Sequence, residues 1–178
     1  MLLVGPTFRG KYAEKDRQIL MARRARCLSF VADSAEGWGA AKNAYEDLVK
    51  EFGIKDAGGQ FQARAIVARP ILLPPYLELG AVYFELGRWT KIHYDNAISV
   101  FTDVTSVAGQ GGEPWWIGRY MTILSHFRRG GPKDIMTAQI AIKQIQANYP
   151  DFDGGKYGLK EKFIELLKEI ERTGAANR

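Results

Sequence analysis

The sequence predicts an all-α protein, and three observations support this prediction. Apolar residues recur at helical spacing in one segment after another, as in residues 157–172, where one face is apolar and the other strongly charged. Glycine and proline separate these segments. Stretches in which apolar and polar residues alternate, as in a half-buried strand, are nearly absent. With 178 residues, 46% of them hydrophobic, the chain is long enough for one domain with a sizeable core.

The helices can be placed in chain order by their apolar faces. Residues 1–13 show little periodicity, and we expect an irregular leader there. Glycines and prolines in residues 54–74 predict a loop with a short helix near 60–68. Pro75 suits the first turn of the following helix, where its missing N–H costs nothing. The predicted helices cover residues 14–32, 38–52, 75–86, 89–107, 113–128, 134–148 and 157–172.

A repeated pattern relates the second helix of each successive pair. It reads Ala41-x3-Tyr45 in the first pair, Ala97-x3-Phe101 in the second and Ala138-x3-Ile142 in the third. A residue four positions further on lies one turn along the same face. The alanine would therefore let two helices approach closely, and the larger side chain would fill the space beside the partner helix.

The first helices carry a related pattern. It is clearest in Tyr76-x2-Leu79-Gly80-x2-Tyr83, and Ala25-x2-Leu28-Ser29-x2-Ala32 repeats its spacing with smaller side chains. In the third pair, Trp115 and Trp116 stand near the expected large residue. One such hairpin cannot bury its own apolar face, so the pattern predicts neighbouring hairpins packed on either side.

These residues resemble the tetratricopeptide repeat, whose pattern is W-x2-L-G-x2-Y…A-x3-F…P. The resemblance covers roughly residues 17–53 and 76–150. It implies a single helical domain over 14–178, in which hairpins at about 14–53, 75–107 and 113–149 stack as a short right-handed solenoid. The helix at 157–172 would be a C-terminal cap. Between Trp89 and Ala97 the chain has about five residues more than the pattern, so we expect an irregular superhelix with a longer second helix in the middle pair.

The resemblance also implies a concave surface, lined by the first helices, that binds a protein or peptide. Its contact positions fall on Arg26 and Leu77 and, four residues on, on Phe30 and Ala81. Members that capture the C-terminal carboxylate of a chaperone tail use Lys and Asn there, and Leu77 and Ala81 supply no donors. A chaperone-tail receptor is therefore not expected.

The predicted groove is instead apolar and partly aromatic. Phe30 and Phe84 are candidates for its lining, and it would hold an apolar peptide or another subunit of a larger complex. Trp115 and Trp116 are adjacent and cannot point the same way, so one of them is a candidate exposed anchor.

Residues able to carry chemistry are sparse. Cys27 lies in a helical stretch and is expected to be a small buried thiol. His93 and His126 are far apart, and Asp151 and Asp153 lack the later acceptors of a calcium loop. We therefore expect no metal site, no cofactor and a non-enzymatic role. An enzyme on an all-α scaffold stays a third hypothesis without a residue set to nominate a reaction.

The net charge of +5 leaves one further alternative, a basic helical surface that binds nucleic acid. Its candidate contacts are Arg17, Arg23, Arg24, Arg26, Arg128 and Arg129. Self-association through an uncovered end of the helical array is also open. The sequence shows no apolar run long enough to cross a bilayer and no signal peptide, which makes a cytoplasmic location the default expectation.

Overall fold

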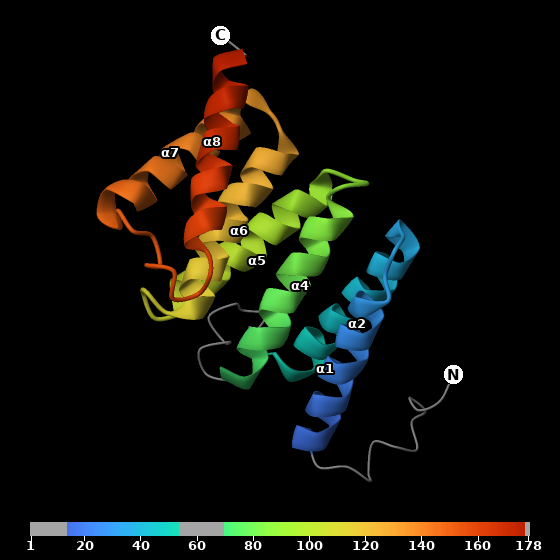
Figure 1. The fold of residues 1–178 in the computed structure, drawn as a ribbon. Helices are drawn as coiled ribbons and strands as arrows, with labels where there is room; N and C mark the ends of the chain where they lie inside the picture. The colour runs from blue at the N-terminus through green and yellow to red at the C-terminus, as the bar shows by residue number, and fades with distance from the viewer. Residues whose placement is uncertain (1–13, 54–69, 177–178) are drawn as a thin grey trace, which may run out of the picture.

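The computed structural model describes residues 14–53 and 70–176, and these residues are helical, with no strand among them. Seven α-helices follow one another, with a short 3₁₀-helix, η2, before the third (Figure 1). Their bounds are α1 Glu14–Phe30, α2 Ala35–Phe52, η2 Pro70–Leu72, α4 Leu73–Leu86, α5 Ile92–Val107, α6 Glu113–Arg129, α7 Pro132–Asn148 and α8 Lys160–Ala176. The all-α prediction is confirmed for this part of the chain. The predicted leader at 1–13 and the predicted helix near 60–68 lie outside the described residues.

Successive helices pack against one another in chain order. Each helix from α1 to α8 contacts the next one along the chain, and α1 also contacts α4, α4 contacts α6, and α6 contacts α8. Figure 1 shows α1 and α2 at one end of the molecule and α7 and α8 at the other. None of the described helices is long and apolar enough to span a membrane.

The helix ends follow from local chemistry. Ser34 caps α2, because its hydroxyl accepts a hydrogen bond from the Gly37 N–H at 3.2 Å. Pro74 and Pro75 occupy the first turn of α4, where no intrahelical N–H is required. Gly130 ends α6 in the left-handed conformation, with φ of 80°, which glycine adopts without steric cost.

Close approach of the helices depends on small residues. Ala25, Ala41, Ala97 and Ala138 are fully buried. A Cβ atom placed on Gly80 of α4 would lie 2.8 Å from the ring of Phe101 on α5, so only a glycine fits against that ring without a shift.

The additional residues of the middle pair lie in its turn. The prediction of a longer second helix is wrong, because α5 is no longer than α2 or α7. Residues 87–91 form the connection between α4 and α5 instead. At its start, Gly87 packs against Tyr94, whose ring would lie 2.5 Å from an added Cβ atom.

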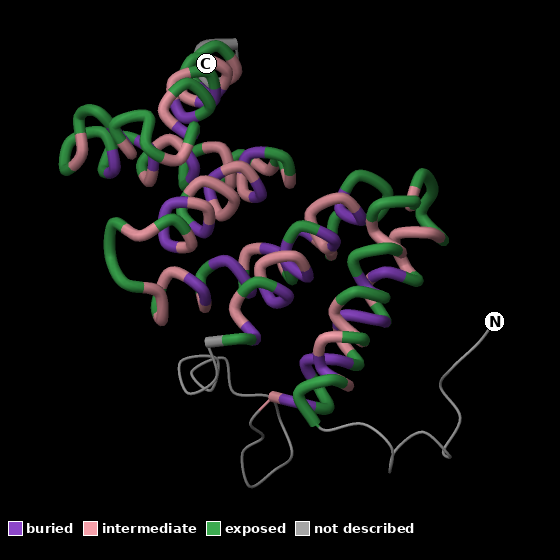
Figure 2. The backbone as a smooth tube through the Cα atoms, turned by 60° about the horizontal axis from the view of Figure 1, so that its bottom comes forward, coloured by how far each residue is buried: buried purple, intermediate pink, exposed green. Residues whose placement is uncertain are grey.

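The buried apolar side chains form two clusters. Figure 2 marks the buried positions along the backbone in purple. The first joins α1, α2 and α4 to Val100 and Val104 of α5. The second joins α6, α7 and α8, and Phe163 at its centre contacts the rings of Trp116, Tyr120 and Phe152. Half-buried Ala108, just after α5, packs against both clusters.

Helix α1 is the least covered part of the structure. Only Gln18 and Ala25 are buried on it, because it packs mainly on α2 and α4. The prediction of a buried Cys27 thiol is wrong, since Cys27 is exposed. Phe30 and Val31, which follow it in the sequence, are exposed as well.

Candidate functional site between helices α1 and α4

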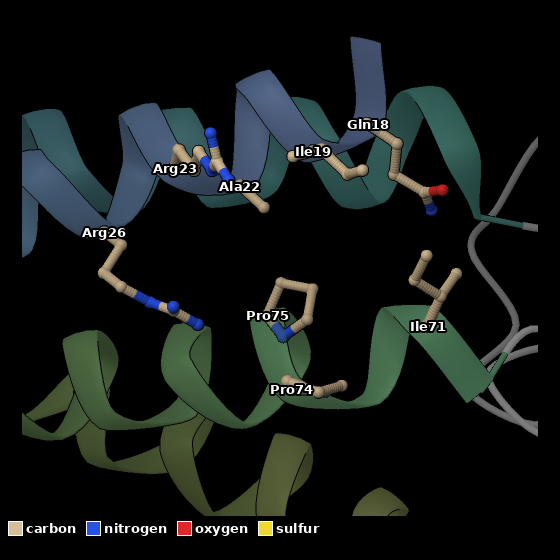
Figure 3. Close-up of a pocket in the computed structure, with 8 residues that line it drawn as sticks. All are labelled: Gln18, Ile19, Ala22, Arg23, Arg26, Ile71, Pro74 and Pro75. Atoms are coloured by element: carbon tan, nitrogen blue, oxygen red, sulfur yellow. The ribbon is translucent and has the colours of Figure 1, made fainter. Parts of the chain in front are cut away.

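An open cavity of about 210 Å³ lies between α1 and the beginning of α4 (Figure 3). Helix α1 and the η2–α4 segment each supply one wall. The lining residues are Gln18, Ile19, Ala22, Arg23, Arg26, Ile71, Pro74 and Pro75. The cavity thus lies between two helices that α2 separates in the chain.

The helical periodicity of α1 builds the first wall. Ile19, Ala22, Arg23 and Arg26 lie three, four and seven residues apart, which places them along one side of the helix. Ile19 and Ala22 are half-buried, while the arginines are exposed. This wall therefore has an apolar lower part and a cationic edge.

Proline chemistry shapes the opposite wall. Pro74 and Pro75 fix the backbone at the start of α4 and offer no N–H donor to a ligand. Ile71 precedes them in η2 and is 48% exposed. The wall is consequently rigid and apolar, and it contributes no hydrogen-bond donor from either proline.

A hydrogen-bonded network holds Arg26 at the edge of the cavity. Its Nε and Nη2 atoms donate to Oε1 of Glu78 on α4 at 2.8 and 2.5 Å. The Tyr45 hydroxyl on α2 donates to the other oxygen of the same carboxylate at 2.9 Å. In Figure 3, the Arg26 side chain extends from α1 towards α4.

The network affects the pKa values of Arg26 and Tyr45. The hydrogen bond and charge of Glu78 raise the pKa of Arg26, so this guanidinium stays charged. Burial, together with the Glu78 carboxylate, raises the pKa of Tyr45 to about 12. The Tyr45 hydroxyl therefore remains a proton donor to Glu78 at neutral pH.

Arg23 differs from Arg26 in its pairing. No carboxylate pairs with it among the described residues. It lies one turn before Arg26 and lines the same cavity. The cavity thus combines a fixed, paired arginine with a second arginine whose charge is not compensated within this part of the structure.

The structure brings only some of the predicted contact residues together. Arg26 lines the cavity. Phe30 is the last residue of α1 and is 89% exposed, and Ala81 is exposed in the second half of α4. Leu77 and Phe84 are half-buried: Leu77 packs against the first cluster, and Phe84 packs edge-on against Tyr94 at 5.5 Å between ring centroids.

The tryptophan pair is not an exposed anchor. Trp115 and Trp116 are both buried in the second cluster, so the prediction that one is available to a partner is wrong. Adjacent residues point in different directions, but the ring of Tyr149 packs edge-on against both, at 5.6 and 5.2 Å. Residues on both sides of this part of α6 are thereby removed from solvent.

The lining of this cavity differs from the partly aromatic groove that the sequence predicts. Its lining contains aliphatic residues, prolines and arginines but no aromatic ring. Sequence reasoning missed Ile19, Ile71 and Pro74. The spacing of Ile19, Arg23 and Arg26 along one side of the helix is a signal in the sequence for the α1 wall. The sequence offers no such signal for Ile71, because the position of η2 against α1 depends on tertiary packing.

Other polar clusters have structural roles. Arg129 at the end of α6 binds Asp95 of α5 and Asp134 of α7, which lowers the pKa of Asp134 and ties three helices together. The Asp153 carboxylate accepts hydrogen bonds from the backbone N–H groups of Gly155, Tyr157 and Leu159 before α8. Among the described residues, no group of three or more His, Cys, Asp or Glu side chains could hold a metal ion.

Most of the arginines in the nucleic-acid alternative are engaged in ion pairs. Of these six arginines, only Arg23 and Arg24 lack a carboxylate partner in the part of the chain that the structure describes. The pairs are Arg17–Glu51, Arg26–Glu78, Arg128–Glu169 and Arg129 with Asp95 and Asp134. Pairing reduces the charge that these residues would present to a phosphate backbone.

Comparison with protein-family models, with curated proteins and with solved structures finds no match for this chain. A function is therefore inferred from the cavity between α1 and α4 and from its two arginines.

Proposed function

We propose that this protein is a non-enzymatic interaction module whose helical hairpins are arranged as in a tetratricopeptide-like solenoid. In this proposal, an unstructured segment of a partner protein binds in the cavity between α1 and α4. The partner segment would belong to another subunit of a larger assembly. The observation that carries the proposal is the open cavity between the first helices of two successive hairpins.

The packing between helices supports the repeat arrangement. Contacts between α1 and α4, α4 and α6, and α6 and α8 are those expected when first helices of successive hairpins lie side by side. The glycine and phenylalanine of the repeat pattern, Gly80 and Phe101, also pack directly on one another. Both features are consistent with a serial stack of hairpins.

The third hairpin gives further support, because a pattern on α6 matches that of α4 at residues other than the two tryptophans. Half-buried Tyr120 and buried Ile123 and Phe127 on α6 have the same spacing as Tyr76, Leu79 and Tyr83 on α4. The pattern begins at the fourth residue of α4 but at the eighth residue of α6, because α6 begins earlier relative to it.

The same register relates one contact of the third hairpin to the middle hairpin. Arg128 takes the place on α6 that Phe84 has on α4, and it binds Glu169 of α8 at 2.7 Å. The capping helix thus engages the corresponding position of the third hairpin. Between α1 and α4, by contrast, the cavity is open.

The test is selection of binders from a random-peptide display library by the full chain. Ile71→Asp places a charge in the apolar wall of the cavity, and Ile140→Asp makes the same change on α7. The two isoleucines have nearly equal exposure, 48% and 50%, so the two substitutions are expected to have similar effects on the stability of the fold. We expect enrichment with wild type and with Ile140→Asp, and loss of it with Ile71→Asp.

Two results would contradict the proposal. If wild type enriches no peptide over an empty matrix, the interaction role is wrong. If Ile71→Asp and Ile140→Asp enrich peptides equally well, the binding site lies elsewhere. Thermal unfolding of both variants checks that any loss of binding does not come from a loss of structure.

A further inference from the structure

We propose that the cavity between α1 and α4 selects peptide segments in which an aspartate or glutamate side chain stands next to an apolar one. This inference rests on the proposed function and specifies the chemistry of the bound segment. It follows from three features of the lining: its net charge, the orientation of Arg26 and the absence of donors from the proline wall.

The net charge of the lining favours an acidic ligand. Arg23 and Arg26 are the charged residues that line the cavity, and no carboxylate lines it. The nearest acidic group in the network, Glu78, is already bound by Arg26 and by the Tyr45 hydroxyl. A ligand carboxylate would therefore meet the uncompensated charge of Arg23 without competing acidic lining groups.

Arg26 supplies an oriented donor beside that charge. Glu78 takes its Nε and Nη2 atoms, so Nη1 is the guanidinium nitrogen that does not bond Glu78. The pair with Glu78 restricts the guanidinium before a ligand arrives, and such preorganisation reduces the entropy lost on binding. Arg26 and Arg23, one turn apart, can together donate to the two oxygens of one carboxylate.

The remaining lining selects an apolar neighbour. Ile19, Ile71 and Pro74 present hydrocarbon surface, and neither Pro74 nor Pro75 has an N–H that would hydrogen-bond a polar group. A volume of about 210 Å³ is below the range typical of sites for drug-sized ligands, so the cavity suits a side chain rather than a whole small molecule. An acidic residue adjacent to an apolar one would satisfy both parts of the lining.

The experiment uses the same random-peptide display library with three proteins: wild type, Arg23→Glu and Arg24→Glu. Arg24 is the matched control, because it is an exposed arginine next in sequence that does not line the cavity. Neither arginine is engaged in an ion pair with a described residue, so both changes are expected to leave the fold intact.

We expect wild type and Arg24→Glu to enrich peptides with an acidic residue beside an apolar one, and Arg23→Glu to lose the acidic preference. For a labelled peptide carrying the enriched sequence, fluorescence polarisation should show binding about tenfold weaker to Arg23→Glu than to Arg24→Glu. Replacing the acidic residue of that peptide by its amide should weaken binding to wild type and to Arg24→Glu but not to Arg23→Glu.

The failure of this inference is distinguishable from failure of the proposed function. Enrichment of peptides without acidic residues, or equal effects of the two arginine changes, would overturn the acidic preference while leaving a peptide-binding cavity in place. Enrichment of acidic peptides without an apolar neighbour would overturn the apolar part of the inference and indicate a general anion site. The absence of any enriched peptide would refute both proposals.

Discussion

Gly80 of α4 lies directly against the ring of Phe101 on α5: a Cβ atom at position 80 would be 2.8 Å from two of the ring carbons. Val100 lies almost as close, with its Cγ1 atom at 2.9 Å from that position. Phe101 is buried, so its ring has little room to move aside. The absence of a side chain at Gly80 therefore sets how closely the two helices of the middle hairpin approach.

Replacing Gly80 by alanine is expected to destabilise the protein by about 1–3 kcal/mol, because overpacking outweighs the helix propensity gained. Gly39 of α2 provides the control, since no atom outside its immediate surroundings lies within 4 Å of a Cβ atom added there. Gly39→Ala should stabilise the protein by about 0.5–1 kcal/mol. Urea unfolding measures both effects, and stabilisation by both changes would contradict the close contact.

Ser125 within α6 and Ser34, the N-cap of α2, are expected to respond in opposite ways to replacement by alanine. The Ser125 hydroxyl is buried without a hydrogen-bond partner among the described groups, so Ser125→Ala should stabilise the fold by up to about 1 kcal/mol. Ser34→Ala removes the N-cap of α2 and should cost about 1 kcal/mol. The free energies of unfolding of the two variants give the comparison, and a large loss for Ser125→Ala would show that its hydroxyl is satisfied.

Phe163 is expected to hold α8 against the second cluster. It has no exposed surface and stacks on Phe152 with ring centroids 4.8 Å apart, so Phe163→Ala should cost about 3–5 kcal/mol. Phe30→Ala makes the same change at a side chain that is 89% exposed, and it should leave stability nearly unchanged. Chemical unfolding followed by tryptophan fluorescence measures both, since Trp116 contacts Phe163. Equal costs would contradict the burial of Phe163 or the exposure of Phe30.

Alkaline pH is expected to weaken the first half of the molecule. Burial raises the pKa values of Tyr45, Tyr76 and Tyr83, with that of Tyr45 reaching about 12, and each hydroxyl donates to a carboxylate. The folded state therefore binds these protons more tightly than the unfolded state, where tyrosine has a pKa near 10.0. The stability from these groups is complete below pH 10, and that from Tyr45 is lost as the pH rises from 10 to about 12. The contributions of Tyr76 and Tyr83, whose pKa values are raised further, go on falling at higher pH.

Urea unfolding at a series of pH values tests this dependence, and Tyr45→Phe is the informative variant. It removes one of the titrating groups, so its stability should fall less steeply between pH 10 and 12 than that of wild type. A free energy of unfolding that stays constant over this interval in wild type would contradict the tyrosine–carboxylate contacts.

Sequence patterns predicted the helices because most of them have one buried face. The fully buried Ala41, Ala97 and Ala138 recur at similar places in their helices, and this repetition indicated where helices approach closely. Helix ends were less certain, as α2 begins at Ala35 rather than Trp38 and α8 at Lys160 rather than Tyr157. Capping interactions such as that of Ser34 fix these ends, and apolar periodicity alone does not locate them.

Errors concerned residues whose exposure depends on neighbours distant in sequence. Cys27 has apolar neighbours in the chain, but α1 has no helix over its outer side among those described, so the thiol is exposed. Trp115 and Trp116 are both buried because Tyr149, more than thirty residues away, packs against both rings. Helical periodicity contains no information on either arrangement.

The candidate site was only partly within reach of the sequence. Arg26 was predicted as a contact residue and lines the cavity, and the helical stripe that includes Arg23 was readable from the spacing. Ile71 and Pro74 belonged to a segment that was predicted as a loop, and their position opposite α1 arises from the packing of α4. The ion pair between Arg26 and Glu78 spans two hairpins and could not be inferred from either alone.

The chain-order packing of the helices has a consequence for how the protein acquires its structure. Since each helix mainly touches those nearest to it along the chain, most native contacts can form after closing only short loops. Folding should then be fast for a chain of this length, and assembly can begin within either cluster and spread to the adjoining helix. During synthesis, α1 and α2 could pair before the ribosome has produced α8.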